Sequence, residues 1–131
     1  MRLYAGLAED VIFQPAVGNY AQGMLGAVPI FIKKASVANI HEILAEAYVG
    51  SVFIEVAPLQ AIERSPGVDP QALNNTNRMR LRVFGNDARG QVLLMAIYDN
   101  LGKGASGAAV QNLNLMIGAE EGLGVDLPSA N

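Results

Sequence analysis

Apolar and polar residues alternate with different periods along the chain, and each period predicts an element. Short apolar runs predict a strand at 11–13 and a longer strand from Met24 to Ile32. Pro29 lies inside the longer run and has no N–H to donate to a β-ladder. We therefore expect the strand around Pro29 to lie at a sheet edge or to carry a bulge.

The next segment has the spacing of an amphipathic helix. Apolar residues recur at helical intervals from 37 to 47, with Ser36 before them as a candidate N-cap and Gly50 after them. The pattern predicts a helix that ends near Val49 and packs one face on the core.

Three further runs predict a strand and a β-hairpin joined by a long connection. The strand is expected at 52–56, and the connection at 60–77 is rich in Pro, Gly, Asn and Asp. Alternation at 79–83, a turn at 86–90 and a continuous apolar run at 92–97 predict the hairpin. The last run lacks alternation, which favours a central strand covered on both faces.

A glycine-rich loop at 100–104 leads into a predicted helix at 105–117 that is apolar around almost its whole girth. Such a helix is expected to be buried. The loop places free N–H groups and the Asn100 amide together, which suits an anion or a carboxamide. The alternative is that the glycines only make a tight turn.

Composition restricts the possible functions. The 131 residues are 51% apolar and 16% charged, with a net charge of −3, no cysteine and one histidine. This predicts one globular domain and no basic surface for nucleic acid or an acidic membrane. No run reaches the roughly 18 apolar residues of a membrane span and no leader is evident, so a cytoplasmic protein is expected. Disulfides and thiolate metal sites are excluded, and no metal site is expected.

Residues 99–116 read DNLGKGASGAAVQNLNLM, which is similar to the DNLxKGAxGxAVQNxN signature of N-acetyl-γ-glutamyl-phosphate reductases. Two other stretches agree in the same order: PAVGNYAQGM at 15–24, and TNR at 76–78 followed by VFGN at 83–86. The chain therefore resembles this reductase family from Tyr4 to Gly118.

The resemblance implies an NADPH-dependent enzyme of arginine biosynthesis. It would reduce an acyl phosphate to a semialdehyde and phosphate, through a cysteine thiolate that forms a thioester and a histidine that handles the proton. The implied fold is α+β: a mixed β-sheet with helices on one face, as in the catalytic and dimerisation domain of glyceraldehyde-3-phosphate-dehydrogenase-like enzymes, incomplete at its N-terminus. A homo-oligomer is implied as well.

The family's nucleotide-binding domain, nucleophilic cysteine and catalytic histidine would all precede this sequence. We therefore expect residues 1–131 to form a partial catalytic and dimerisation domain, with its C-terminal helix at about 104–118 and without the Rossmann NADP-binding domain. Such a chain has no catalytic residue of its own and is predicted to be inactive alone. Two alternatives are a non-catalytic oligomerisation or binding module of the same fold, and a reductase of another acyl phosphate such as aspartyl phosphate.

The resemblance also suggests binding residues. Asn100 matches a position near the nicotinamide carboxamide of NADP, with Leu101, Gly102, Lys103 and Gly104 beside it. Lys103 has a second interpretation as a solvated loop cation.

Gln22 and Gly23 match a segment that carries substrate-side groups, although Gln22 is equally suited to bond a neighbouring strand. Arg78 is a candidate ligand for the substrate anion. An exposed charged face is the simpler interpretation of Arg78, Arg80 and Arg82 on an alternating strand. His41 is expected on the surface or at an interface.

Overall fold

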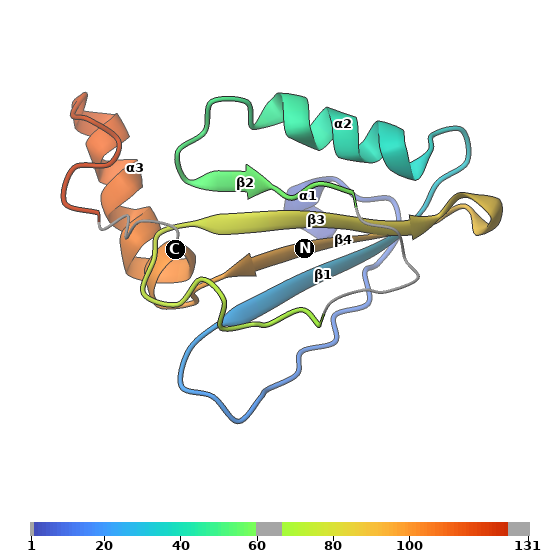
Figure 1. Cartoon of the computed structure of the whole chain (residues 1–131), viewed down its shortest axis with the longest axis horizontal. Coiled ribbons are helices and arrows are strands. Elements are labelled where there is room, and N and C mark those ends of the chain that lie inside the picture. The colour runs from blue at the N-terminus through green and yellow to red at the C-terminus, as the bar shows by residue number, and fades with distance from the viewer. Residues whose placement is uncertain (1, 60–66, 126–131) are drawn as a thin grey trace.

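A mixed four-stranded sheet forms the centre of the molecule, as Figure 1 shows. The structure is a computed structural model, and it describes residues 2–59 and 67–125. The strands are β1 (Met24–Phe31), β2 (Ile54–Val56), β3 (Met79–Asn86) and β4 (Gln91–Tyr98), in the order β1-β4-β3-β2. β4 pairs antiparallel with β1 and β3, whereas β2 runs parallel to β3. This confirms the predicted mixed α+β architecture, and β1 lies at the sheet edge as Pro29 requires.

β3 and β4 form the predicted hairpin. Its turn contains a 3₁₀ helix, η2 (Asp87–Arg89), and the Asn86 side-chain oxygen accepts from the Arg89 backbone N–H at 3.1 Å. β4 is central, as predicted, and Val92 and Ile97 are only 3% exposed. The four residues between them are half-buried, so the described chain covers this strand less completely than its apolar sequence predicts.

α2 (Val37–Ala47) packs against β3 and β2, and Figure 1 shows it lying along these strands. Its N-terminus is the predicted one. The Ser36 hydroxyl accepts from the Asn39 N–H at 3.1 Å, and the Asn39 side chain accepts from the Ser36 N–H at 3.2 Å. Asp87 of the hairpin turn accepts the Val37 N–H at 2.7 Å. The helix is therefore capped from its own sequence and tied to the β3–β4 turn.

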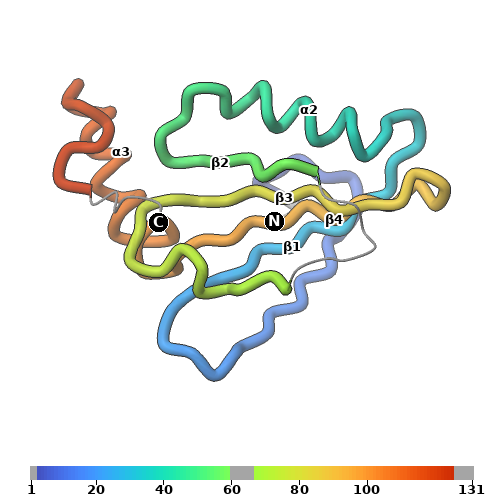
Figure 2. The backbone as a smooth tube through the Cα atoms, in the orientation of Figure 1, coloured from blue at the N-terminus to red at the C-terminus, as the bar shows by residue number. Residues whose placement is uncertain are grey.

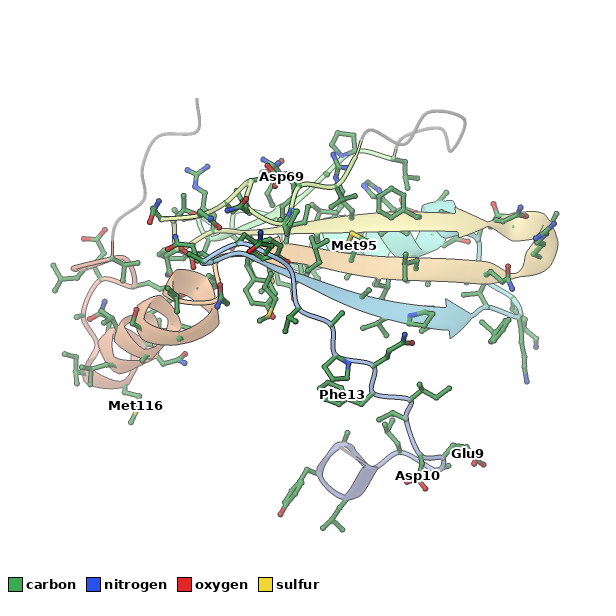
Figure 3. The ribbon with its side chains drawn as sticks, turned by 90° about the horizontal axis from the view of Figure 1, so that it is seen from below. Glu9, Asp10, Phe13, Asp69, Met95 and Met116 are labelled. Atoms are coloured by element: carbon green, nitrogen blue, oxygen red, sulfur yellow. The ribbon has the colours of Figure 1, made fainter. Side chains whose placement is uncertain are left out.

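The strand predicted at 11–13 is wrong. After α1 (Arg2–Ala5) the chain is extended but pairs with no strand in the described part of the molecule. Ile12 is 96% exposed and Phe13 is 71% exposed, and Figure 3 shows Phe13 on a segment that stands off from the sheet. An apolar run becomes a strand only where a neighbour completes its hydrogen bonds, and this run has none there.

The C-terminal helix begins with a π-helical turn, η3 (Gly102–Ser106), and continues as α3 (Gly107–Ile117). The predicted burial of this helix is wrong. Met116 is 84% exposed and Ile117 is 68% exposed, and Met116 points away from the molecule in Figure 3. The reason is position: Figure 1 shows α3 at the end of the sheet, not across it. The buried residue of α3 is the polar Asn114. Its side-chain amide donates to the Glu121 and Leu123 carbonyls at 3.1 and 2.8 Å.

The sheet face opposite α2 carries Met95 and is visible in Figure 3. The strand register places Ala27 of β1 and Arg82 of β3 beside Met95 on this face.

Within 2–59 and 67–125, no helix has the length and apolar character of a membrane span.

Candidate functional site

The site begins where β4 ends, at Asp99. This residue is 2% exposed, and its carboxylate accepts hydrogen bonds from two distant segments and from its own loop. One oxygen accepts the Leu101 N–H at 2.8 Å. The other accepts the Asn75 N–H at 2.7 Å and the Gln22 side-chain amide at 3.1 Å. The carboxylate thus joins the loop after β4 to the segments around 22 and 75.

The hydrogen bonds decide the charge state of Asp99. Burial alone raises the pKa of this carboxyl, because it disfavours the charged form. Backbone N–H groups of Leu101, Asn75 and Gly102 favour the charged form and outweigh burial, so the pKa lies below its ordinary value of 3.8. Asp99 is therefore an anion at neutral pH.

Asn100 is half-buried beside Asp99 and faces the start of β1. Its side-chain oxygen accepts the Gly23 N–H at 2.7 Å. This bond fixes the orientation of the amide. Its nitrogen, Nδ2, has no partner within the described part of the chain, so the donor end of the amide is available.

Gln22 and Gly23 lie against the segment that follows residue 67, and Figure 2 shows the two stretches side by side. The Gln22 side-chain amide also donates to the Asn75 side chain at 2.9 Å, and the Gln22 backbone carbonyl accepts from the Asn74 side chain at 3.1 Å. Gly23 has a φ of +115°, and a Cβ there would lie 2.5 Å from the Pro70 carbonyl oxygen. Glycine is required at 23 on both counts.

Lys103 is held within the protein. Its ammonium donates to the Gln111 side-chain oxygen at 2.6 Å and lies 5.3 Å from the centre of the Phe53 ring. Burial lowers the pKa of Lys103, and the nearby Glu121 carboxylate partly opposes this shift. A phosphate at this position would compete with partners that the ammonium already has.

The remaining loop residues differ in accessibility. Leu101 is 54% exposed, whereas Gly102 packs so closely that a Cβ would lie 2.8 Å from the Thr76 carbonyl oxygen. Gly104 donates its N–H to the Asp99 carbonyl at 2.8 Å. Gly102 therefore allows the loop to pack closely on segment 74–78, whereas Gly104 packs against Tyr98 and Asp99.

Segment 74–78 carries buried polar atoms that lack hydrogen-bond partners among the described residues. Three buried atoms have no hydrogen-bond partner among the described residues: Asn74 Oδ1, Asn77 Oδ1 and Arg78 Nε. Buried polar groups normally have partners, so three unpartnered atoms within five residues call for an explanation, and an absent ligand is one. A pocket of about 230 Å³ opens beside this segment, with Asn77, Asp99 and Ser106 in its wall.

The sequence pattern placed Asn74 and Asn75 in the long connection and Asn77 in a motif shared with the family, and it predicted none of their contacts around Asp99. The signal was present, because three asparagines in four positions exceed the needs of one turn. What the sequence lacked was the long-range contact to Asp99 and Gln22.

Other sequence candidates lie elsewhere. The His41 ring nitrogen Nε2 is 2.9 Å from the Ala57 carbonyl oxygen, on α2 and away from Asp99. Arg80 forms an ion pair with Glu55 at 3.2 Å on the sheet surface, in keeping with the charged-face interpretation. Across the described ranges, no three His, Cys, Asp or Glu residues gather in a way that could hold a metal ion.

Comparison with known proteins agrees with this architecture. A family model described as "Semialdehyde dehydrogenase, dimerisation domain" matches residues 1–100, which include the whole sheet and Asp99. The chain belongs to this family. The match ends at Asn100, so η3 and α3 of this dimerisation-family chain lie beyond it.

Curated relatives confirm the resemblance that the sequence motifs indicate. Proteins named N-acetyl-gamma-glutamyl-phosphate reductase are 54% identical in Chelativorans sp. (strain BNC1), over 89% of this chain, and 51% identical in Mesorhizobium japonicum, over 90% of it. The protein of that name from Burkholderia cenocepacia is 51% identical over 91% of this chain. The chain spans about 40% of the length of these relatives.

Proposed function

We propose that this chain is part of an NADPH-dependent reductase that converts N-acetyl-γ-glutamyl phosphate to N-acetylglutamate semialdehyde and phosphate in arginine biosynthesis. The observation that carries the proposal is the identity of 46–54% with reductases of that name over about 90% of the chain. The chain spans about 40% of their length, so the roles that we propose for it depend on the residues it contains.

NADPH, when bound, supplies the hydride for this reduction. Asn100 fits a contact to its carboxamide, because Oδ1 is fixed by Gly23 and Nδ2 donates to none of the described residues. Leu101, Gly102 and Gly104 would then border the nicotinamide through their backbone. Lys103 fits a direct phosphate contact less well, since it already contacts Gln111 and Phe53.

Arg78 is the proposed contact for the substrate anion. Its Nε is buried and lacks an acceptor among the described residues, which a phosphate or carboxylate oxygen would supply. Gln22 and Gly23 would act indirectly on the substrate side, because both contact Asp99 or Asn100. The thiolate nucleophile would come from polypeptide outside residues 1–131, which contain no cysteine.

We also propose that the intact enzyme is a homo-oligomer of subunits that associate through the sheet face around Met95. The family description names a dimerisation domain, and α2 packs on the other face of the sheet. The competing hypothesis is that the chain serves only as an oligomerisation or binding module. That hypothesis predicts no reductase activity.

The test is a chimaera in which residues 1–125 replace the matching part of the Chelativorans relative. We expect NADP⁺-dependent oxidation of N-acetylglutamate semialdehyde in the presence of phosphate, read as NADPH absorbance, and much weaker turnover of aspartate semialdehyde. The 131-residue chain alone should show none. A chimaera that folds and binds NADPH but lacks this activity would contradict the proposal.

Asn100→Ala in this chimaera should lower kcat by about 10- to 100-fold, because the nicotinamide loses an orienting contact. Asn112→Ala is the matched control, since Asn112 is an exposed asparagine on α3. Equal kcat values for the two variants would remove Asn100 from the cofactor site.

A further inference from the structure

The β1–β4 ladder stops at the pair Met24–Tyr98, and side chains continue the connection beyond it. Gln22 donates to Asp99, and Gly23 donates to the Asn100 side chain. Two consecutive residues on one segment thus bond two consecutive residues on the other. The side-chain oxygens of Asp99 and Asn100 accept here in place of the backbone carbonyls of a β-ladder. The two segments therefore stay hydrogen-bonded although they no longer pair as strands.

We propose that Asp99 is a positioning residue of the reductase site, holding the turn at 22–23 and the loop at 100–104 in one fixed relation. This rests on the proposed function. Asp99 does not contact the reacting atoms; it acts through Gln22, Asn75 and Leu101, to which it is bonded. The consequence is a fixed Asn100 amide with its donor end toward the cofactor side.

The bonding pattern requires a carboxylate. Both oxygens of Asp99 accept from N–H groups, and the side chain is 2% exposed, so water cannot replace a lost partner. An asparagine of the same shape would set its NH₂ group against a backbone N–H in either orientation. A carboxylate needed only for solubility would not be buried among four donors from three segments.

Gln22 provides the sharper variant, because it is half-exposed and bonds Asp99 through its side chain. Gln22→Met keeps the length of the side chain and removes its amide, and with it the Nε2 donor to Asp99 and Asn75. Asp99 then keeps its bonds to Asn75 and Leu101, so the fold is retained, while the Gly23–Asn100 bond is the one described hydrogen bond left between residues 22–23 and the loop at 100–104.

The first measurement is amide hydrogen exchange in the 131-residue chain. In Gln22→Met, the Gly23 amide should exchange about tenfold faster, the effect of losing one supporting hydrogen bond. In Asp99→Asn, the Asn75, Leu101 and Gly23 amides should all accelerate. Asp69→Asn is the control, an exposed aspartate that accepts the Gln71 N–H at 2.8 Å. An unchanged Gly23 amide in both site variants would overturn the proposal.

The second measurement is steady-state kinetics of the chimaera carrying Gln22→Met. We expect kcat to fall about tenfold or more while the thermal midpoint stays near that of the parent, a split that a purely structural role would not produce. Full kcat in an active chimaera would overturn the positioning role. An inactive parent chimaera would refute the proposed function, and hydrogen exchange would then decide whether Asp99 couples the segments.

Discussion

At the scale of single residues, the site depends on a few polar side chains whose partners are far away in sequence. Asp99 contacts Gln22 across 77 residues and Asn75 across 24. Asn100, the residue that we propose for the cofactor contact, has its amide oxygen fixed by Gly23, and its amide nitrogen has no partner among the described residues. The motif thus supplies both the proposed ligand contact and the groups that orient it.

Asp99 should make the stability of the chain depend on pH. Its pKa is lower in the folded than in the unfolded state, so its stabilising effect is complete above the ordinary value of 3.8 and is lost as pH falls through the lower, folded pKa. The difference in unfolding free energy between the parent and Asp99→Asn should therefore be largest near neutral pH and shrink below about pH 4.

Urea unfolding at several pH values measures this difference. Asp69→Asn controls for the loss of one negative charge at an exposed position. A difference between parent and Asp99→Asn that is constant from pH 7 to pH 3 would show that Asp99 carries no such linkage.

At the scale of elements, α2 and α3 show when local sequence decides the outcome. Ser36 and Asn39 cap α2 from its own sequence, so its start is predictable. α3 has an equally clear helical sequence and ends at Gly118 in the left-handed conformation, but its apolar side chains stay exposed. The local sequence determined that α3 is a helix. It did not determine which surface, if any, covers the apolar side chains of that helix.

Ser36→Ala should lower the unfolding free energy by about 1 kcal/mol, because the Asn39 N–H loses its acceptor at the helix start. Ser36→Asp keeps an acceptor and is the matched control. Thermal or urea unfolding followed by circular dichroism measures both variants. Equal stabilities for the alanine and aspartate variants would show that the contact of Asp87 with Val37 suffices to cap α2.

At the scale of the whole molecule, exposed apolar side chains remain on two sides of the described chain: Leu25 and Phe31 on the sheet face that carries Met95, and Leu113, Met116 and Ile117 on α3. Contiguous apolar surface of this kind marks interaction sites. The match to the family model ends at residue 100, before η3. The sheet surface therefore lies within the matched dimerisation domain, and α3 lies beyond it.

Met95→Glu should weaken self-association of the reductase chimaera by about 100-fold or more, because burying a carboxylate in the proposed interface costs more than a pair with the cross-strand Arg82 returns. Val49→Glu is the control, since Val49 is 83% exposed and follows α2 on the other side of the sheet. Sedimentation velocity over a concentration series measures both. Unchanged association of the Met95 variant would place the interface elsewhere.

The sequence by itself determined the family, the order of most strands and helices, and the motif around Asn100, because hydrophobic period, proline and capping residues act over a few positions. It failed at 11–13, where a strand needs a partner that the apolar pattern does not specify. Tertiary structure alone decided that Asp99, Gln22 and segment 74–78 form one site. Hydrogen bonds across 24 to 77 residues depend on how the sheet brings segments together, which no local pattern encodes.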